Sequence, residues 1–182
     1  KAMKGCDAVI HLAALIGIPY SYISPTAYIK TNIEGTFNIL ESAKNQNLNQ
    51  VIVTSTSEVY GTAKNKNLKE TDQVSAQSPY AATKIAADQL ALSYFKSFNL
   101  PVKIIRPFNT FGPRQSLRAV IPTIITQLLS DNKTIKMGAL TTKRDFTYVS
   151  DTVNGFISVI GNKKCIGETI NLGTGYDFSI RD

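Results

Sequence analysis

Tyr80 and Lys84 are the residues whose types and spacing point most directly to chemistry. They follow Ser78 and Pro79, which are typical of the N-cap and the first position of a helix. In a helix, residues four apart lie on one face. A lysine ammonium beside a phenol favours the phenolate and lowers a pKa that is otherwise about 10. The pair therefore predicts a base that works near neutral pH.

The spacing alone leaves a second interpretation open, namely a helix start with an incidental surface pair. Tyr60 and Lys64 have the same spacing, but they follow a strand-like run and enclose Gly61, so we expect a loop there. The elements around Tyr80 must therefore decide between the two interpretations.

The chain alternates apolar runs with helical periodicity, which is typical of βαβ units and a mostly parallel sheet. Ligands bind such sheets beyond the carboxyl ends of the strands. Three expected strand ends carry small or polar residues, at 13–14, 55–58 and 109–114. Because these strand ends are expected to converge on the start of the helix that carries Tyr80, the sequence favours a catalytic site over a purely structural role for these residues.

The expected elements follow from periodicity and from proline and glycine positions. His11, the only histidine, is expected to pack in the core rather than to bind a ligand. Strands are expected over 8–14, 50–56, 101–106, 134–137 and 168–172, helices over 29–43, 79–98, 119–129 and 150–160, and loops over 15–28 and 64–77.

Composition restricts the class of protein. The 182 residues are 43% hydrophobic, enough for one ordinary domain with a core. Cys6 and Cys165 show neither metal-site nor disulfide spacing, which predicts no metal and a cytoplasmic location. The net charge of +7 comes from scattered side chains, typical of a solvated surface that could also favour an anionic substrate. We expect neither nucleic-acid binding nor a membrane span.

Six segments spread along the chain form one recognisable series: His11-Leu12-Ala13-Ala14, Asn32 within 31–36, Ser55 to Gly61, Ser78 to Lys84, Arg106 to Arg114, and Arg144 to Asp151. Together and in this order they resemble the extended short-chain dehydrogenase/reductase superfamily, in particular its NAD-dependent nucleotide-sugar epimerases and dehydratases. The loop 18–22 and the stretch 118–123 are most similar to bacterial UDP-N-acetylglucosamine 4,6-dehydratases of legionaminic-acid type pathways.

The resemblance implies a Rossmann-type doubly wound parallel sheet that lacks its first three strands. The family's phosphate-cradling glycine loop is absent from the sequence. We therefore expect a fragment, with the second half of the NAD domain at 1–110 and part of a substrate-binding region at 111–182. The run 8–14 would form a sheet edge, and the fragment by itself should bind NAD poorly and turn over little. A homodimer is also expected.

The resemblance also implies the site residues. The catalytic residues would be Thr56, Glu58, Tyr80 and Lys84. NAD would contact Leu12, Ala13, Ala14, Asn32, Ser55, Tyr80, Lys84 and Pro107. The nucleotide sugar would contact Thr56, Ser57, Asn109, Arg114 and Arg144, with the two arginines facing its diphosphate.

The implied reaction is a 4,6-dehydration. Tyr80 would take the proton from the C4 hydroxyl as hydride passes to NAD, and Lys84 would hold the nicotinamide ribose. Glu58 would then remove the acidified C5 proton, water would leave from C6, and the hydride would return to C6.

Ser57 is a departure from the Thr-Asp-Glu sequence of the dTDP-glucose branch, where the aspartic acid protonates the leaving hydroxyl. Either Glu58 serves as both base and acid, or Ser57 positions a water. Plain epimerases usually have no carboxylate at the position of Glu58, so this residue favours dehydration. A UDP-sugar 4-epimerase and an NAD-sensing or scaffold protein remain the alternatives.

Overall fold

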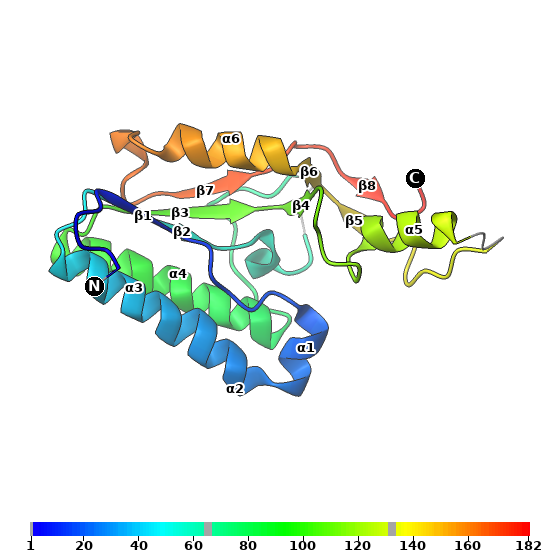
Figure 1. Ribbon diagram of the computed structural model, residues 1–182, viewed down its shortest axis with the longest axis horizontal. Coiled ribbons are helices and arrows are strands. Elements are labelled where there is room, and N and C mark those ends of the chain that lie inside the picture. Colours follow the sequence, from blue (N-terminus) through cyan, green and yellow to red (C-terminus); the bar gives the residue numbers. More distant parts are fainter. Residues whose placement is uncertain (1, 64–66, 131–133) are drawn as a thin grey trace.

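The main sheet has four parallel strands in the order β1-β2-β3-β7 (Figure 1). The computed structural model describes residues 2–63, 67–130 and 134–182. The strands are β1 (Ala8–His11), β2 (Gln50–Thr54), β3 (Val102–Pro107) and β7 (Thr169–Leu172). This is the α/β, Rossmann-like parallel sheet that the sequence predicts.

Helices cover both faces of this sheet. α3 (Gly35–Asn45) and α4 (Pro79–Phe98) lie on one face, and α6 (Val149–Val159) lies on the other (Figure 1). Because side chains alternate along a strand, β2 sends Val51 and Val53 into the first core and Ile52 into the second. Each such fully buried aliphatic side chain stabilises the fold by about 1.5–3 kcal/mol.

The remaining elements gather largely around the carboxyl ends of the strands. A parallel pair, β4–β6, and an antiparallel pair, β5–β8, lie beyond the main sheet. The elements are α1 (Ile18–Ile23), α2 (Pro25–Tyr28), the π-helix η1 (Ile29–Glu34), the 3-10 helices η2 (Ser57–Tyr60) and η3 (Lys163–Cys165), α5 (Val120–Leu129), β4 (Asn109–Phe111), β5 (Lys143–Arg144), β6 (Phe146–Tyr148) and β8 (Phe178–Ser179).

Two expected segments around β1 differ from the structure. The strand expected over 8–14 ends at His11, and Ile10 is 39% exposed because β1 lies at the sheet edge. The expected loop over 15–28 contains α1 and α2. His11 is buried as expected, and its Nε2 lies 3.2 Å from Thr36 Oγ1.

The strand expected over 134–137 is absent from the structure. The side chain of Gln127 satisfies both backbone groups of Lys136: the Lys136 N–H donates to Oε1 at 2.7 Å, and Nε2 donates to the Lys136 carbonyl at 2.9 Å. Lys136 therefore pairs both of its backbone groups without a neighbouring strand.

Candidate active site

The start of α4 carries Tyr80 and Lys84 into the interior. Ser78 is the N-cap, and its Oγ accepts a hydrogen bond from the Ala81 N–H at 3.1 Å. Pro79 is the first residue of the helix. Tyr80 is 6% exposed and Lys84 is 4% exposed. The pair is thus buried at the edge of the core, and the interpretation as an incidental surface pair is wrong.

The Lys84 ammonium points toward the end of β2. Its Nζ donates to the carbonyl oxygen of Thr54 at 2.5 Å. Burial lowers the pKa of Lys84, and the nearby charge of Asp88 opposes that shift. Lys84 therefore joins α4 to the strand that leads into Thr56 and Glu58.

The Tyr80 phenol is not the ready phenolate that the spacing predicts. Burial raises the pKa of Tyr80 to about 12, and a hydrogen bond with Thr56 opposes this shift only in part. The charge of Glu58 raises the pKa further. The predicted lowering by Lys84 is therefore wrong for the protein alone, because desolvation dominates.

Thr56 and Glu58 lie beside Tyr80 on the turn that follows β2. Thr56 caps η2, with its Oγ1 accepting from the Glu58 N–H at 3.2 Å. The Glu58 side chain is 30% exposed, so its carboxylate is accessible from solvent. Arg144 Nε on β5 lies 4.0 Å from Glu58 Oε1. A phenol, a hydroxyl, a carboxylate and a guanidinium thus meet at one edge of the sheet.

The segment after β1 provides small and accessible side chains. Leu12 and Ala13 are exposed and Ala14 is half-buried. Asn32 on η1 holds this segment: its Oδ1 accepts from the Leu15 N–H at 2.9 Å, and its Nδ2 donates to the Leu15 carbonyl at 3.0 Å. Asn32 thus shapes the position expected to face NAD.

The residues present fit only part of NAD. Pro107 ends β3, and the small residues 13–14 follow the end of β1, so both lie at the carboxyl edge of the sheet, which suits a flat ring and its ribose. The Ser55 hydroxyl donates to Asp88 at 2.9 Å and points into the core instead. The sequence has no glycine loop for the pyrophosphate.

The residues expected at the nucleotide sugar come from separate elements. Ser57 begins η2 next to Glu58, and Asn109 begins β4 with its N–H bonded to the Asp145 carbonyl at 3.0 Å. Arg114 is exposed in a left-handed conformation with φ 67°. Arg144 on β5 lies beside Glu58, and the roles of all these residues at the sugar stay predictions.

The sequence reasoning missed Asp88, Arg106 and Asp145, which are all buried. Asp88 lies four residues after Lys84 and therefore on the same helix face as Tyr80 and Lys84, so an acidic residue at that spacing was the available signal. Asp145 accepts from Thr174 and from the Gly175 N–H at 2.8 Å, which fixes the turn after β7. Lys64 of the second Tyr-x-x-x-Lys sequence lies outside the described residues.

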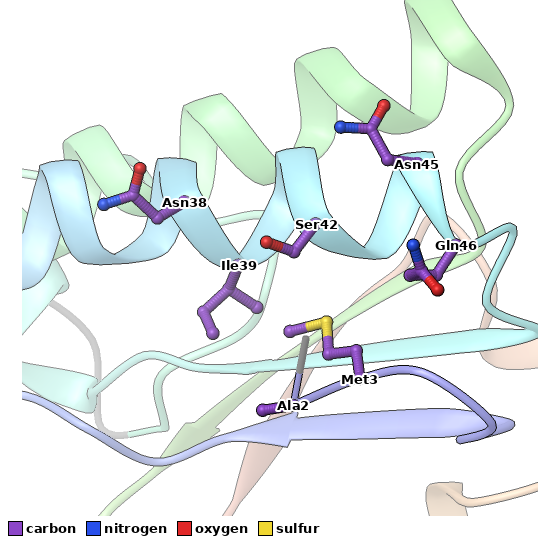
Figure 2. Close-up of a pocket in the computed structure, with 7 residues that line it drawn as sticks. All are labelled: Ala2, Met3, Asn38, Ile39, Ser42, Asn45 and Gln46. Atoms are coloured by element: carbon purple, nitrogen blue, oxygen red, sulfur yellow. The ribbon is translucent and has the colours of Figure 1, made fainter.

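A surface hollow of about 330 Å³ lies away from this site (Figure 2). Its lining residues come from the N-terminal segment and from α3 with its C-cap: Ala2, Met3, Asn38, Ile39, Ser42, Asn45 and Gln46. None of them is among the predicted site residues. Within 2–63, 67–130 and 134–182, no group of three or more His, Cys, Asp and Glu could hold a metal ion.

Known proteins are similar to this chain in sequence and in fold. It is 36% identical over 187 residues to the dTDP-D-glucose 4,6-dehydratase of Dictyostelium discoideum, covering 97% of this chain and 43% of that protein. The chain therefore spans about half the length of the curated relatives that it matches. No described helix is long and apolar enough to cross a membrane.

Two solved structures superpose closely. DesIV, a dTDP-glucose 4,6-dehydratase from Streptomyces venezuelae with NAD bound, has a TM-score of 0.93 at 30% identity, covering 100% of this chain and 56% of that one. The UDP-glucuronic acid 4-epimerase of Bacillus cereus, with UDP-glucuronic acid and NAD, has a TM-score of 0.93 at 35% identity, covering 100% and 58%.

The profile of one family matches residues 1–173, which include every predicted site residue. With the parallel sheet and the buried Tyr80–Lys84 pair, this match shows that the chain belongs to the NAD dependent epimerase/dehydratase family.

Proposed function

We propose that the full-length protein is an NAD-dependent nucleotide-sugar 4,6-dehydratase that acts on a UDP-N-acetylhexosamine. The observation that carries this proposal is the Glu58 carboxylate beside Thr56 and Tyr80. Glu58 is close enough for its charge to raise the pKa of Tyr80, and its side chain is accessible. Oxidation at C4 needs no such carboxylate, whereas removal of a C5 proton does.

The chain's own residues divide the proton transfers between them. Tyr80 accepts the C4 hydroxyl proton, and Thr56 hydrogen-bonds the phenol and thereby favours the phenolate. Glu58 accepts the proton from C5. When bound, NAD supplies the hydride acceptor and donor, and its positive nicotinamide favours the Tyr80 phenolate. Lys84 and the segment 12–14 would hold the nicotinamide ribose.

The acid that protonates the departing C6 hydroxyl is assigned to Glu58. Ser57 occupies the neighbouring position and has no acidic proton to give near neutral pH. Having taken the C5 proton, Glu58 can donate it to the leaving oxygen, with Ser57 positioning a water as the alternative route. Glu58 then takes a proton from solvent and gives it to C5 as the hydride returns to C6, and Tyr80 releases the C4 hydroxyl proton to solvent. Arg144 and Arg114 would bind the diphosphate, and Asn109 would hydrogen-bond nearby.

The substrate class rests on the resemblance of 18–22 and 118–123 to the legionaminic-acid type UDP-N-acetylglucosamine dehydratases. Within this proposal residues 1–110 supply the catalytic half, and residues 111–182 supply part of the substrate-binding region. We expect the enzyme to work in the cytoplasm as a homodimer.

A UDP-sugar 4-epimerase is the second candidate. It is supported by the 35% identity to a UDP-glucuronic acid 4-epimerase, which is similar to the 36% identity to the dehydratase of Dictyostelium discoideum. An epimerase would use the same Tyr80–Lys84 pair and would leave Glu58 without a proton to remove.

Incubation of the full-length enzyme with UDP-N-acetylglucosamine in deuterated water separates the two functions. Dehydration gives a product lighter by one water that carries solvent deuterium at C5. A product of unchanged mass, inverted at C4 and free of deuterium at C5, would establish the epimerase and reject the dehydratase.

A further inference from the structure

A buried ion pair beneath the site is unused by the mechanism above. Asp88 on α4 is 1% exposed, and Arg106 on β3 is 5% exposed. Asp88 Oδ2 accepts from Arg106 Nε at 3.2 Å and from Nη2 at 3.0 Å. Within the described residues, the other carboxylate oxygen of Asp88 is buried and has no hydrogen-bond partner.

This pair forms hydrogen bonds to both ends of the turn 55–60, which contains the predicted catalytic residues Thr56 and Glu58. The Ser55 hydroxyl donates to Asp88 Oδ2 at 2.9 Å. Arg106 Nη1 donates to the Tyr60 hydroxyl at 2.9 Å, and its guanidinium carbon lies 4.9 Å from the centre of that ring. Tyr60 in turn donates to Asn171 Oδ1 on β7 at 2.7 Å.

The two attachment points bracket the predicted catalytic residues in the sequence. Ser55 immediately precedes Thr56, and Tyr60 follows Glu58 by two residues. The same carboxylate belongs to α4, which carries Tyr80 and Lys84. A single buried pair thus connects the helix that bears the phenol to both ends of the turn that bears the carboxylate.

Stability by itself does not account for such a pair. Desolvating two charges offsets most of their attraction, and well-packed apolar side chains of similar size are often as stable. A planar guanidinium with several fixed donors does, however, specify relative orientation. The network joins α4, β2, η2, β3 and β7, which are the elements that must stay in register for Tyr80 and Glu58 to face one substrate.

We propose that Asp88 and Arg106 are positioning residues that hold the turn 55–60 against α4, so that Thr56 and Glu58 keep their places relative to Tyr80. This inference rests on the proposed function for its reaction but not for its geometry. Misplacing reacting groups by about 1 Å can slow a reaction by about 100-fold without weakening substrate binding.

The main test uses the full-length enzyme with both charges removed together, as Asp88→Leu/Arg106→Met. We expect kcat to fall by about 100-fold with KM little changed. Hydrogen exchange without substrate should become faster for the amides of 57–61 while α3 stays protected. A folded double variant with wild-type kcat and wild-type exchange would overturn the proposal.

Lys103→Met is the matched control, because Lys103 is a buried cation on the same strand as Arg106. Its Nζ bonds instead to Gln50 and Val159, which lie away from the catalytic turn. We expect wild-type kcat and wild-type exchange over 57–61 from this variant. An equal loss of kcat in the control would show a general effect of disturbing β3 and would count against the proposal.

Tyr60→Phe decides the matter if the double variant does not fold. It keeps the ring beside Arg106 and removes only the hydroxyl that joins Arg106 to Asn171. We expect a kcat about tenfold lower and faster exchange over 57–61; wild-type values of both would overturn the proposal. Hydrogen exchange is measured without substrate, and kcat is measured on whichever reaction the wild type performs. Finding that the wild type is an epimerase would therefore reject the proposed dehydratase function and leave the test of the positioning role intact.

Discussion

At the scale of single residues, Tyr80 shows how burial and its neighbours compete. The pKa of Tyr80 is raised to about 12 by desolvation, lowered by its hydrogen bond to Thr56 and raised by the charge of Glu58. Desolvation therefore sets the pKa of Tyr80, and the two residues of the turn after β2 adjust it in opposite directions. The Lys84 ammonium, bonded to the Thr54 carbonyl, does not overcome desolvation.

The two turn residues should shift the pH dependence of C4 oxidation in opposite directions. The oxidation rate rises with pH as Tyr80 loses its proton. Thr56→Val removes a bond that lowers the pKa, so the rising limb should move to higher pH. Glu58→Gln removes a charge that raises the pKa, so the limb should move to lower pH. Cofactor reduction followed against pH measures both, and shifts in the same direction would contradict this account.

Glu58→Gln should also separate the two halves of the proposed reaction. The amide cannot take the C5 proton, so water loss and deuterium uptake at C5 should fall by at least about 100-fold. C4 oxidation, seen as cofactor reduction, should survive. Glu168→Gln, an exposed change at the amino end of β7, is the control. Normal dehydration by the Glu58 variant would show that another group is the base.

At the scale of elements, the start of α4 fixes the site. Ser78 caps the helix, and the last turn is closed by Asn99 in a left-handed conformation with φ 55°. A long helix with defined ends places Tyr80, Lys84 and Asp88 on one buried stripe. The position of the Tyr80–Lys84 pair is therefore set by the first turns of this helix.

Ser78→Ala should lower both stability and activity. Loss of the cap leaves the Ala81 N–H without its partner and costs about 1 kcal/mol, which thermal or urea unfolding measures. The first turn, including Tyr80, should then fray and kcat should fall. Ser93→Ala lies in the same helix, where its exposed hydroxyl bonds only to the Leu90 carbonyl, and it should change neither quantity appreciably. Equal losses in both variants would count against a specific effect of the cap.

At the scale of the whole molecule, a second buried cation joins the sheet to α6. Lys103 on β3 donates to Gln50 Oε1 at 2.9 Å and to the Val159 carbonyl near the end of α6 at 2.8 Å. A cation at a helix carboxyl end is favourable, but burial lowers the pKa of Lys103. Both acceptors also receive backbone N–H bonds, from Gly161 and Asn162.

Lys103→Met should therefore be tolerated, with the free energy of unfolding changed by no more than about 1 kcal/mol. Because the folded pKa is below the ordinary 10.5, the unfolded chain binds the proton more tightly in the interval between them. The wild type should gain stability as pH rises through that interval, and the variant should lack this gain. Denaturant unfolding of the full-length protein at several pH values tests both, and identical pH dependence would contradict the assignment.

The sequence alone determined the parallel α/β architecture, the long helix at 79–98 and the convergence of strand ends on Tyr80. Those features depend on hydrophobic periodicity, on helix capping and on the alternation of strands and helices. All three signals come from residues that are close together in the sequence. The glutamate after the second strand was placed at a strand end in the same way, whereas its predicted role as a base came from the family resemblance.

Only the tertiary structure decided how these groups affect one another. It turned Lys84 toward Thr54, brought Arg144 of β5 to Glu58, and buried Asp88 against Arg106. It also replaced an expected strand at 134–137 by side-chain bonds from Gln127. Such contacts join residues far apart in the chain, and desolvation depends on everything packed around a group, so neither local spacing nor composition specifies them.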